Sequence, residues 1–396
     1  MILKNLSVLL GKELHYKSSY SIQISKQKFH RIQENIKPSS NESVIDCQGL
    51  IAIPGFINSH THIGDSIAKD FTLNKTVDEK IHPVFGAKPK ILKKSSSAHL
   101  SAFIENTCKS MIKNGITTFV DFREGGLDGI ELIRKATSKI PIRAIILGRV
   151  EHYSSPTQIR KNALFPREKS SELTKILAKC DGLGISGANE NSDSVLGYYS
   201  KTSKLRAIHA AETKQSVDTS KKITKKSEVL RALKLKPHFL VHMTYASNSD
   251  LNLVAKKTRG IVICPRANAA LAEGIPNIFP MLRSQCTIAI GTDNVMINSP
   301  NMFREMDYLW KATMGLNKKR IDPRLILKMA TTNASSILHK NIGIIERGRL
   351  ADLVLIDKHA IDLEPMHNPY ASLVHRASES TIRTVLIGGN VVHGKI

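Results

Sequence analysis

The sequence predicts an α/β protein built around a closed (β/α)8 barrel, with a small β-rich unit formed by both ends of the chain. From about residue 51 to residue 340, short apolar runs alternate with longer amphipathic stretches. Eight such runs can be counted, which is the number of strands in a closed parallel barrel. The first and last fifty residues instead contain short strand-like runs separated by polar turns.

The two ends of the chain are the first elements to place. Strands are expected at 6–10, 20–25 and 43–47, and again at 350–357, 381–387 and 390–393. Gly388-Gly389 joins the last two, which is typical of a hairpin. Residues 1–51 with 346–396 are therefore expected to form one composite β unit, and 52–345 the barrel.

The barrel elements follow in order between these ends. Its strands are predicted at 50–53, 116–121, 142–147, 182–186, 205–209, 239–242, 261–264 and 287–291. The clearest helices between them are predicted at 99–114, 127–138, 247–258 and 300–315. A doubly wound open sheet is the alternative interpretation of the same alternation.

Composition excludes several classes of protein. The 396 residues are 41% hydrophobic, too apolar for a disordered chain. No apolar run approaches the ~18–20 residues that span a bilayer, and the first residues resemble a strand rather than a signal peptide. The five cysteines are scattered without a Cys-x-x-Cys pair, as expected of reduced thiols. We therefore expect a cytoplasmic protein with no membrane partner.

The net charge of +24 raises the question of a polyanionic partner such as nucleic acid. Because the basic residues do not cluster along the chain, a solvated basic surface is the favoured interpretation, and nucleic acid is not an expected partner.

Histidines and one aspartate stand at the ends of several predicted strands. His60 and His62 follow the first strand, and in an extended segment their side chains point to the same side. His209 ends the fifth strand, His242 ends the sixth, and Asp293 follows the eighth. Because the carboxyl ends of barrel strands surround one pocket, these residues predict a metal site there.

Longer motifs extend this pattern over essentially the whole chain. They are Pro54-Gly-Phe-Ile-Asn-Ser-His60-Thr-His62, His209-Ala-Ala-Glu212-Thr, Val241-His242, Cys264-Pro265-x-x-Asn268, Gly291-Thr-Asp293 and Gly343-Ile-Ile-Glu-Arg-Gly-Arg-Leu-Ala-Asp352-Leu-Val-Leu-Ile-Asp357. With these motifs the chain resembles the amidohydrolase superfamily, and within it the mononuclear aminohydrolase branch, which includes cytosine, S-adenosylhomocysteine and guanine deaminases and chlorohydrolases.

The resemblance implies a TIM-like metal-dependent hydrolase barrel with a small composite β-sandwich. It implies that His60, His62, His209 and Asp293 bind one divalent ion, Zn²⁺ or alternatively Fe²⁺. The dinuclear branch uses a lysine at the end of strand four, and residues 184–189 contain none here. One metal ion per chain is therefore expected.

The resemblance also implies a reaction and its catalytic residues. Non-peptide C–N bonds would be hydrolysed, with deamination of an amino-substituted heterocycle as the first hypothesis. Asp293 would accept a proton from water, Glu212 would protonate the ring and the leaving amine, and His242 would orient the nucleophile and stabilise developing charge. The His-Ala-Pro-Tyr-like segment of S-adenosylhomocysteine deaminases is absent, so the substrate stays open.

Two other functions stay open at this point. The same metal chemistry could open a cyclic amide, as in imidazolonepropionase-like enzymes, or the chain could bind polyanions on a hydrolase scaffold. Arg123, Glu124 and Arg149 follow strands two and three and are candidate substrate contacts. With the lysine-rich segment 63–97, the two arginines suggest an anionic small-molecule substrate. Relatives also suggest a homo-oligomer.

Overall fold

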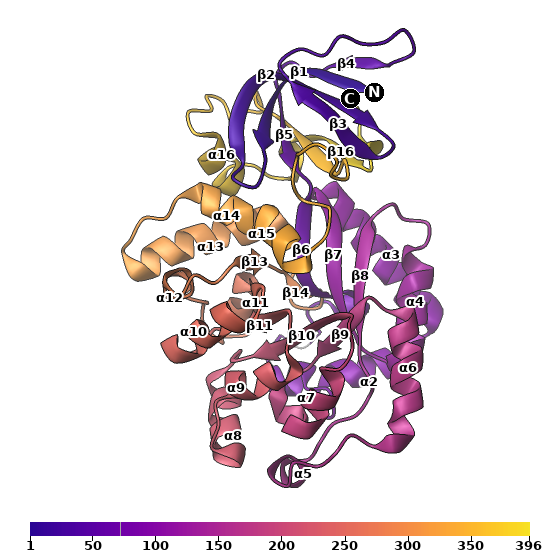
Figure 1. Ribbon diagram of the computed structural model, residues 1–396, viewed down its shortest axis with the longest axis vertical. Coiled ribbons are helices and arrows are strands. Elements are labelled where there is room, and N and C mark those ends of the chain that lie inside the picture. The colour runs from indigo at the N-terminus through magenta and orange to yellow at the C-terminus, as the bar shows by residue number, and fades with distance from the viewer. Residues whose placement is uncertain (72) are drawn as a thin grey trace.

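A computed structural model describes residues 1–71 and 73–396 (Figure 1). It contains an eight-stranded sheet made by the two chain ends and a nine-stranded parallel sheet. Figure 1 shows the terminal sheet at the top and the parallel sheet with its surrounding helices below it. Among the described residues, no helix has both the length and the apolar character needed to cross a membrane.

The terminal sheet joins both ends of the chain, as the sequence predicts. Its strands are β1 (Ile2–Leu10), β2 (His15–Ser25), β3 (Lys28–Gln33), β4 (Val44–Asp46), β5 (Leu50–Pro54), β15 (Leu353–Asp357), β16 (Ile382–Ile387) and β17 (Asn390–Gly394). β5 is the link, because it pairs in parallel with β1 and antiparallel with β15. The boundaries expected for the composite unit, at 51/52 and 345/346, stay predictions.

Two details of this sheet illustrate what the sequence reveals. The predicted Gly388-Gly389 hairpin is confirmed by the antiparallel pairing of β16 with β17. β3 was not predicted; it lies at the edge of the sheet and exposes most of its polar side chains. Such a strand lacks the apolar run on which the other assignments depended.

The second sheet is the predicted barrel. Its strands are β6 (Phe56–His62), β7 (Ile116–Arg123), β8 (Arg143–Gly148), β9 (Gly182–Ile185), β10 (Leu205–Ala210), β11 (Phe239–His242), β12 (Gly260–Ile263), β13 (Ile288–Ile290) and β14 (Asp293–Asn294). β14 follows β13 after two residues and pairs in parallel with β6, so the two behave as one interrupted strand that closes the ring. The alternative of an open doubly wound sheet is therefore wrong.

The first barrel strand is not the one that we expected. The run at 50–53 is β5 of the terminal sheet, and β6 takes its place in the barrel. The chain passes between the sheets at Gly55, whose amide donates to the carbonyl of Asp352 at 3.0 Å. Apolar residues continue on both sides of Pro54-Gly55, so the two strands read as one run. The polar residues from Asn58 to His62, which we expected to follow the first strand, are buried within β6.

Helices and short 3-10 turns cover the barrel strands. The helices are α1 (Val77–Ile81), α2 (Ala87–Lys94), α3 (Ser97–Lys113), α4 (Gly126–Thr137), α5 (Pro156–Arg160), α6 (Ser170–Lys179), α7 (Asp193–Tyr199), α8 (Lys214–Thr224), α9 (Glu228–Ala232), α10 (Asn248–Lys257), α11 (Pro265–Ala270), α12 (Ile278–Arg283), α13 (Met302–Asn317), α14 (Pro323–Met329), α15 (Thr332–Leu338) and α16 (Pro369–His375). The four predicted helices are confirmed as α3, α4, α10 and α13. Polar caps define the starts of α3, α10 and α13: for example, Ser247 accepts a hydrogen bond from the amide of Asp250 at the start of α10.

One ion pair fixes the terminal sheet to the barrel. Asp352, which precedes β15, is 1% exposed and accepts hydrogen bonds from Arg143 Nε at 2.7 Å and Arg143 Nη2 at 2.9 Å. The amide of Gly388 also donates to Asp352 at 2.7 Å. Since Arg143 begins β8 and Phe56 begins β6, the barrel strands start at the terminal sheet and end on the far side. The candidate site therefore lies away from the terminal sheet.

Asp352→Ala should lower the free energy of unfolding by about 3 kcal/mol, because it leaves the Arg143 guanidinium without its bidentate partner. Urea unfolding measures this change. Glu131→Ala is the matched control, since it breaks a pair with Lys179 whose side chains are 51% and 53% exposed. That control should change stability by less than about 1 kcal/mol. Equal costs for the two variants would contradict the proposed link.

Candidate functional site

Five sequence-predicted residues meet at the carboxyl ends of the barrel strands. His60 and His62 lie in β6, His209 in β10, and His242 ends β11, while Asp293 begins β14. His60 Nε2 lies 3.2 Å from His209 Nε2 and 3.2 Å from Asp293 Oδ1. His62 Nε2 lies 3.5 Å from the same carboxylate oxygen. The structure thus brings together the whole predicted ligand set.

The backbone at these strand ends is unusual. Ala211, His242 and Asp293 have φ angles of 50°, 71° and 61°, in the left-handed region that few non-glycine residues occupy. Each follows or ends a barrel strand and turns the chain at the rim of the cavity. Strained backbone of this kind clusters at functional sites, where the surrounding packing maintains it.

Hydrogen bonds determine which nitrogen of two imidazoles faces inward. His62 Nδ1 lies 2.8 Å from Glu124 Oε1 and 3.1 Å from the carbonyl of Phe122, so it carries the hydrogen and donates. His209 Nδ1 lies 3.0 Å from the carbonyl of Ile185 and donates in the same way. In both rings Nε2 is therefore directed at the space between the histidines.

Burial keeps the imidazoles of His60 and His209 neutral. It lowers the pKa of His60 to about 3, and it lowers the pKa of His209 well below its ordinary value. Burial opposes the ionisation of Asp293, but the hydrogen bond with His60 outweighs that effect and holds the pKa of this carboxyl below its usual range. Neutral imidazoles beside a carboxylate form a suitable donor set for a metal ion.

Unpartnered atoms point to the same conclusion. Among the described residues, His60 Nδ1, His242 Nε2, Asp293 Oδ2 and Glu212 Oε1 are buried without a hydrogen-bond partner. Two sets of ligand atoms, from His60, His62 and His209 and from His60, His242 and Asp293, each lie within 4.8 Å of one another. Convergent imidazole nitrogens and a carboxylate fit a divalent ion of the zinc type.

Glu212 and His242 form the second part of the site. Glu212 lies two residues beyond the end of β10, and its Oε2 lies 3.5 Å from His242 Nε2. Burial raises the pKa of Glu212, although the nearby His242 favours its charged form. Asn268 of α11 contacts His242 Nδ1 through its Oδ1 at 3.2 Å and orients the ring. The sequence motif contained Asn268, but it did not reveal this contact.

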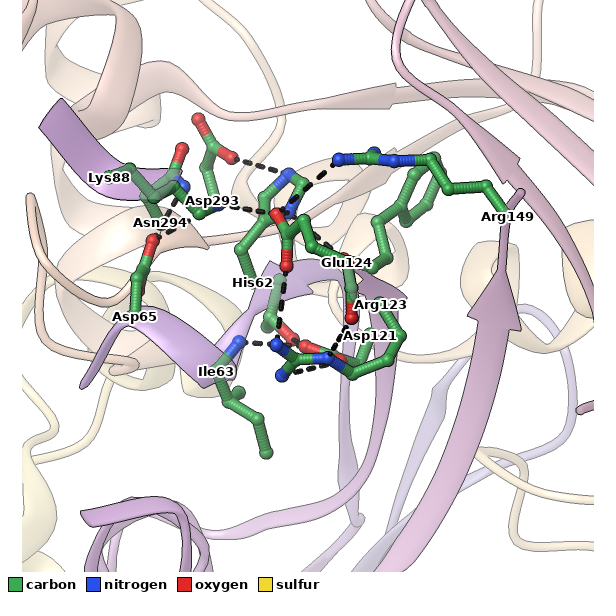
Figure 2. A network of polar contacts seen from close by, with 12 residues as sticks. His62, Ile63, Asp65, Lys88, Asp121, Arg123, Glu124, Arg149, Asp293 and Asn294 are labelled. Atoms are coloured by element: carbon green, nitrogen blue, oxygen red, sulfur yellow. Dashed lines mark hydrogen bonds and ion pairs between the residues drawn. The ribbon is translucent and has the colours of Figure 1, made fainter. Parts of the chain in front are cut away.

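The three weaker candidates occupy a network beside the histidines (Figure 2). Glu124 and Arg149 line the cavity that contains His62, His209, Glu212 and Asp293. Arg123 instead packs its guanidinium toward Asp121 and Glu124, at 3.9 Å and 3.6 Å, and lines a neighbouring cavity. Their role as substrate contacts stays a prediction.

Charge in the site cavity differs from the sequence-based expectation of a basic mouth. That expectation rested on Arg123, Arg149 and the lysines of segment 63–97. Among these residues, in the described part of the chain, only Arg149 and Lys88 line the cavity. Both lie near Glu124, at 3.9 Å and 2.5 Å. The carboxyl-bearing residues that line it are Asp78, Glu124, Glu190, Glu212, Glu228 and Asp293. The cavity therefore gives no support to a preference for anions.

Two members of the network were missed by sequence reasoning. Lys88, from α2, and Asp65, from the 3-10 turn Ile63–Ala68, are 4% and 0% exposed. Asp65 follows the His60-Thr61-His62 motif by three residues, which was a usable signal. Lys88 is one of seven lysines in segment 63–97, and nothing in the sequence distinguishes it from the exposed ones.

Comparisons with known proteins agree with this geometry. The amidohydrolase family matches residues 51–392. A protein of Methanothermobacter thermautotrophicus, provisionally named an aminohydrolase, is 34% identical over 99% of both chains. A 5-methylthioadenosine/S-adenosylhomocysteine deaminase of Pyrococcus horikoshii is 30% identical over 98% of this chain and 94% of its own.

Solved structures show the same fold at low identity. Atrazine chlorohydrolase TrzN from Arthrobacter aurescens TC1, complexed with zinc, superposes with a TM-score of 0.83 at 18% identity and covers 99% of this chain and 95% of its own. Guanine deaminase from C. acetobutylicum superposes with a TM-score of 0.81 at 18% identity and covers 99% of each chain. The chain therefore belongs to the amidohydrolase family and is a hydrolase that acts on non-peptide carbon–nitrogen bonds, as its motifs predict.

Proposed function

We propose that this protein removes an amino group from an aromatic heterocycle by hydrolysis, at a single metal ion held by His60, His62, His209 and Asp293. The observation that carries the proposal is the position of Glu212 beside His242, next to the metal-ligand set and in the same cavity. A deaminase needs such a group to protonate the ring and the leaving amine. When bound, a divalent ion acts as a Lewis acid and lowers the pKa of coordinated water to about 7.

The residues of this chain divide the proton transfers among them. Asp293 Oδ2, which has no partner among the described residues, accepts a proton from the attacking water. Glu212 delivers a proton to a ring nitrogen as the water oxygen bonds to the neighbouring carbon. It then takes a proton from the hydroxyl formed on that carbon and passes it to the amine, so that ammonia leaves as the carbon–nitrogen bond breaks. His242 Nε2 orients the water and stabilises the charge that develops on the attacked carbon's substituents.

A single ion is favoured over two by the end of β9. Residues Ser186, Gly187, Asn189 and Glu190 line the cavity there, and none supplies the lysine that bridges two metals in the dinuclear branch. Zinc is favoured over iron by the imidazole-rich donor set and by the zinc in the related chlorohydrolase structure.

The names of the relatives guide the choice of substrates. Several are deaminases of 5-methylthioadenosine and S-adenosylhomocysteine, so adenosine derivatives come first, followed by guanine, cytosine, pterins and triazines. Release of ammonia supports deamination, whereas a ring-opened acid without ammonia would indicate a cyclic amide hydrolase instead. A small-molecule substrate without nucleic acid, a homo-oligomer and a cytoplasmic location stay predictions.

The purified protein should contain about one zinc or iron ion per chain, and His60→Ala should lose both the ion and the activity. Elemental analysis by mass spectrometry measures the ion content. His99→Ala, on the exposed side of α3, is the matched control and should keep both. Two tightly bound ions per chain would contradict the mononuclear site.

Glu212→Gln should lower kcat by about 10²–10⁴ while leaving the metal content unchanged, because the amide cannot transfer the proton. An ammonia-release assay on the best substrate, with metal analysis of the same sample, tests this expectation. Glu273→Gln changes a nearby carboxyl that does not line the cavity, and it should retain most of the activity. Normal turnover by Glu212→Gln would refute the proposed proton transfer.

A further inference from the structure

Lys88 is a buried lysine on α2, a short helix in the connection between β6 and α3. Its side chain is 5% exposed, whereas Lys90 and Lys94 of the same helix are exposed. A buried ammonium is costly unless carboxylates surround it. Figure 2 shows Lys88 with Asp65 and Glu124, in the same network as His62.

The two carboxylates that Lys88 contacts, those of Asp65 and Glu124, contact different parts of the site. Lys88 Nζ donates to Glu124 Oε1 at 2.5 Å and lies 3.3 Å from Asp65 Oδ2. Glu124 Oε1 also accepts from His62 Nδ1 at 2.8 Å. Asp65 accepts hydrogen bonds from Asn294 Nδ2 at 2.6 Å and from the backbone amide of Met296 at 3.1 Å. Asn294 directly follows Asp293 in the chain.

We propose that Lys88 is a positioning residue that holds His62 and Asp293 in place for metal binding, through Glu124 on one side and Asp65 on the other. The inference rests on the metal-binding role proposed above for His62 and Asp293. It adds that a helix outside the barrel completes the site. Substrate contact is not part of this role.

The charge of Lys88 is what both carboxylates require. Glu124 Oε1 accepts the hydrogen of His62 Nδ1, and that bond directs Nε2 of the ring inward. All three contacts of Asp65 come from donors, so it too acts as an acceptor. Without the ammonium, the buried Asp65 and the partly buried Glu124 lose their nearest cation, and each can relax away from its partner.

The surrounding ions make Lys88 difficult to replace. The network contains three acidic and three basic side chains, joined by ion pairs with N···O distances of 2.5–3.9 Å. They are Asp65, Asp121 and Glu124, and Lys88, Arg123 and Arg149. Arg149 approaches Glu124 only to 3.9 Å, and Arg123 reaches its other oxygen at 3.6 Å. Neither arginine contacts Asp65, so only Lys88 joins the two carboxylates in the described network.

The test is the zinc affinity of the substrate-free protein, measured by competition with a chromophoric chelator. Lys88→Met should bind zinc roughly 10–100-fold more weakly than wild type, as expected when the outer partner of a metal ligand is lost. Lys90→Met is the matched control from the same helix and should bind like wild type. Lys88→Arg keeps the charge and should recover most of the affinity.

A double variant tests whether Lys88 acts through Glu124. Lys88 is proposed to act on His62 through Glu124. The fold-loss of zinc affinity in Lys88→Met/Glu124→Gln should therefore be smaller than the product of the fold-losses in the two single variants. The double variant also removes one charge of each sign, so it serves where Lys88→Met fails to fold. Its zinc affinity should then resemble that of Glu124→Gln and lie well below that of wild type.

The outcomes separate this inference from the proposed function. A zinc affinity equal to that of wild type, in Lys88→Met or in the folded double variant, would overturn the role of Lys88. So would a fold-loss of zinc affinity in the double variant equal to the product of the two single fold-losses. A lower melting temperature of the zinc-free protein with unchanged zinc affinity would reveal a purely structural lysine and overturn the inference too. If wild type itself binds no zinc, the metal assignment fails first. If it binds zinc but releases no ammonia, only the deamination fails.

Discussion

The site depends on the orientation of imidazoles whose Nε2 atoms face one another. His60 Nε2 and His209 Nε2 lie 3.2 Å apart, and the Nδ1 hydrogens of His62 and His209 are already committed to carbonyl and carboxylate oxygens. Ring nitrogens held this close, out of contact with water, need a hydrogen or a cation between them. The surrounding hydrogen bonds therefore prepare the site before any ion arrives.

The barrel supplies the positions that this orientation requires. Parallel strands place residues from β6, β10, β11 and β14 at one rim, and closure through β14 brings Asp293 opposite Thr61. Gly291 allows the last strand to pass close to β6, because a Cβ at that position would lie 2.7 Å from the Cβ of His60. Asp352 fixes the other end of the strands to the terminal sheet, so both ends of the barrel are held.

The sequence predicted most of the barrel and all of the histidine cluster, because strand ends in a parallel barrel share one rim. It misassigned β5, since Pro54-Gly55 does not interrupt the apolar run between two different sheets. It also missed Lys88. The burial of Lys88 depends on a carboxylate distant in the chain, that of Glu124. The local pattern of apolar and polar residues does not predict such a contact. Arg123 was expected in the site cavity for the same reason. Only the folded chain shows that its guanidinium is paired with Asp121 and Glu124.

Zinc K-edge X-ray absorption of the zinc-loaded protein tests the central claim most directly. Three imidazole ligands and one carboxylate predict a first shell of nitrogen and oxygen at about 2.0–2.2 Å, with the multiple scattering typical of histidine. No sulfur should contribute, although Cys264 is buried close to the charged groups of the site. A sulfur scatterer at about 2.3 Å, or a shell with a single imidazole, would contradict the account.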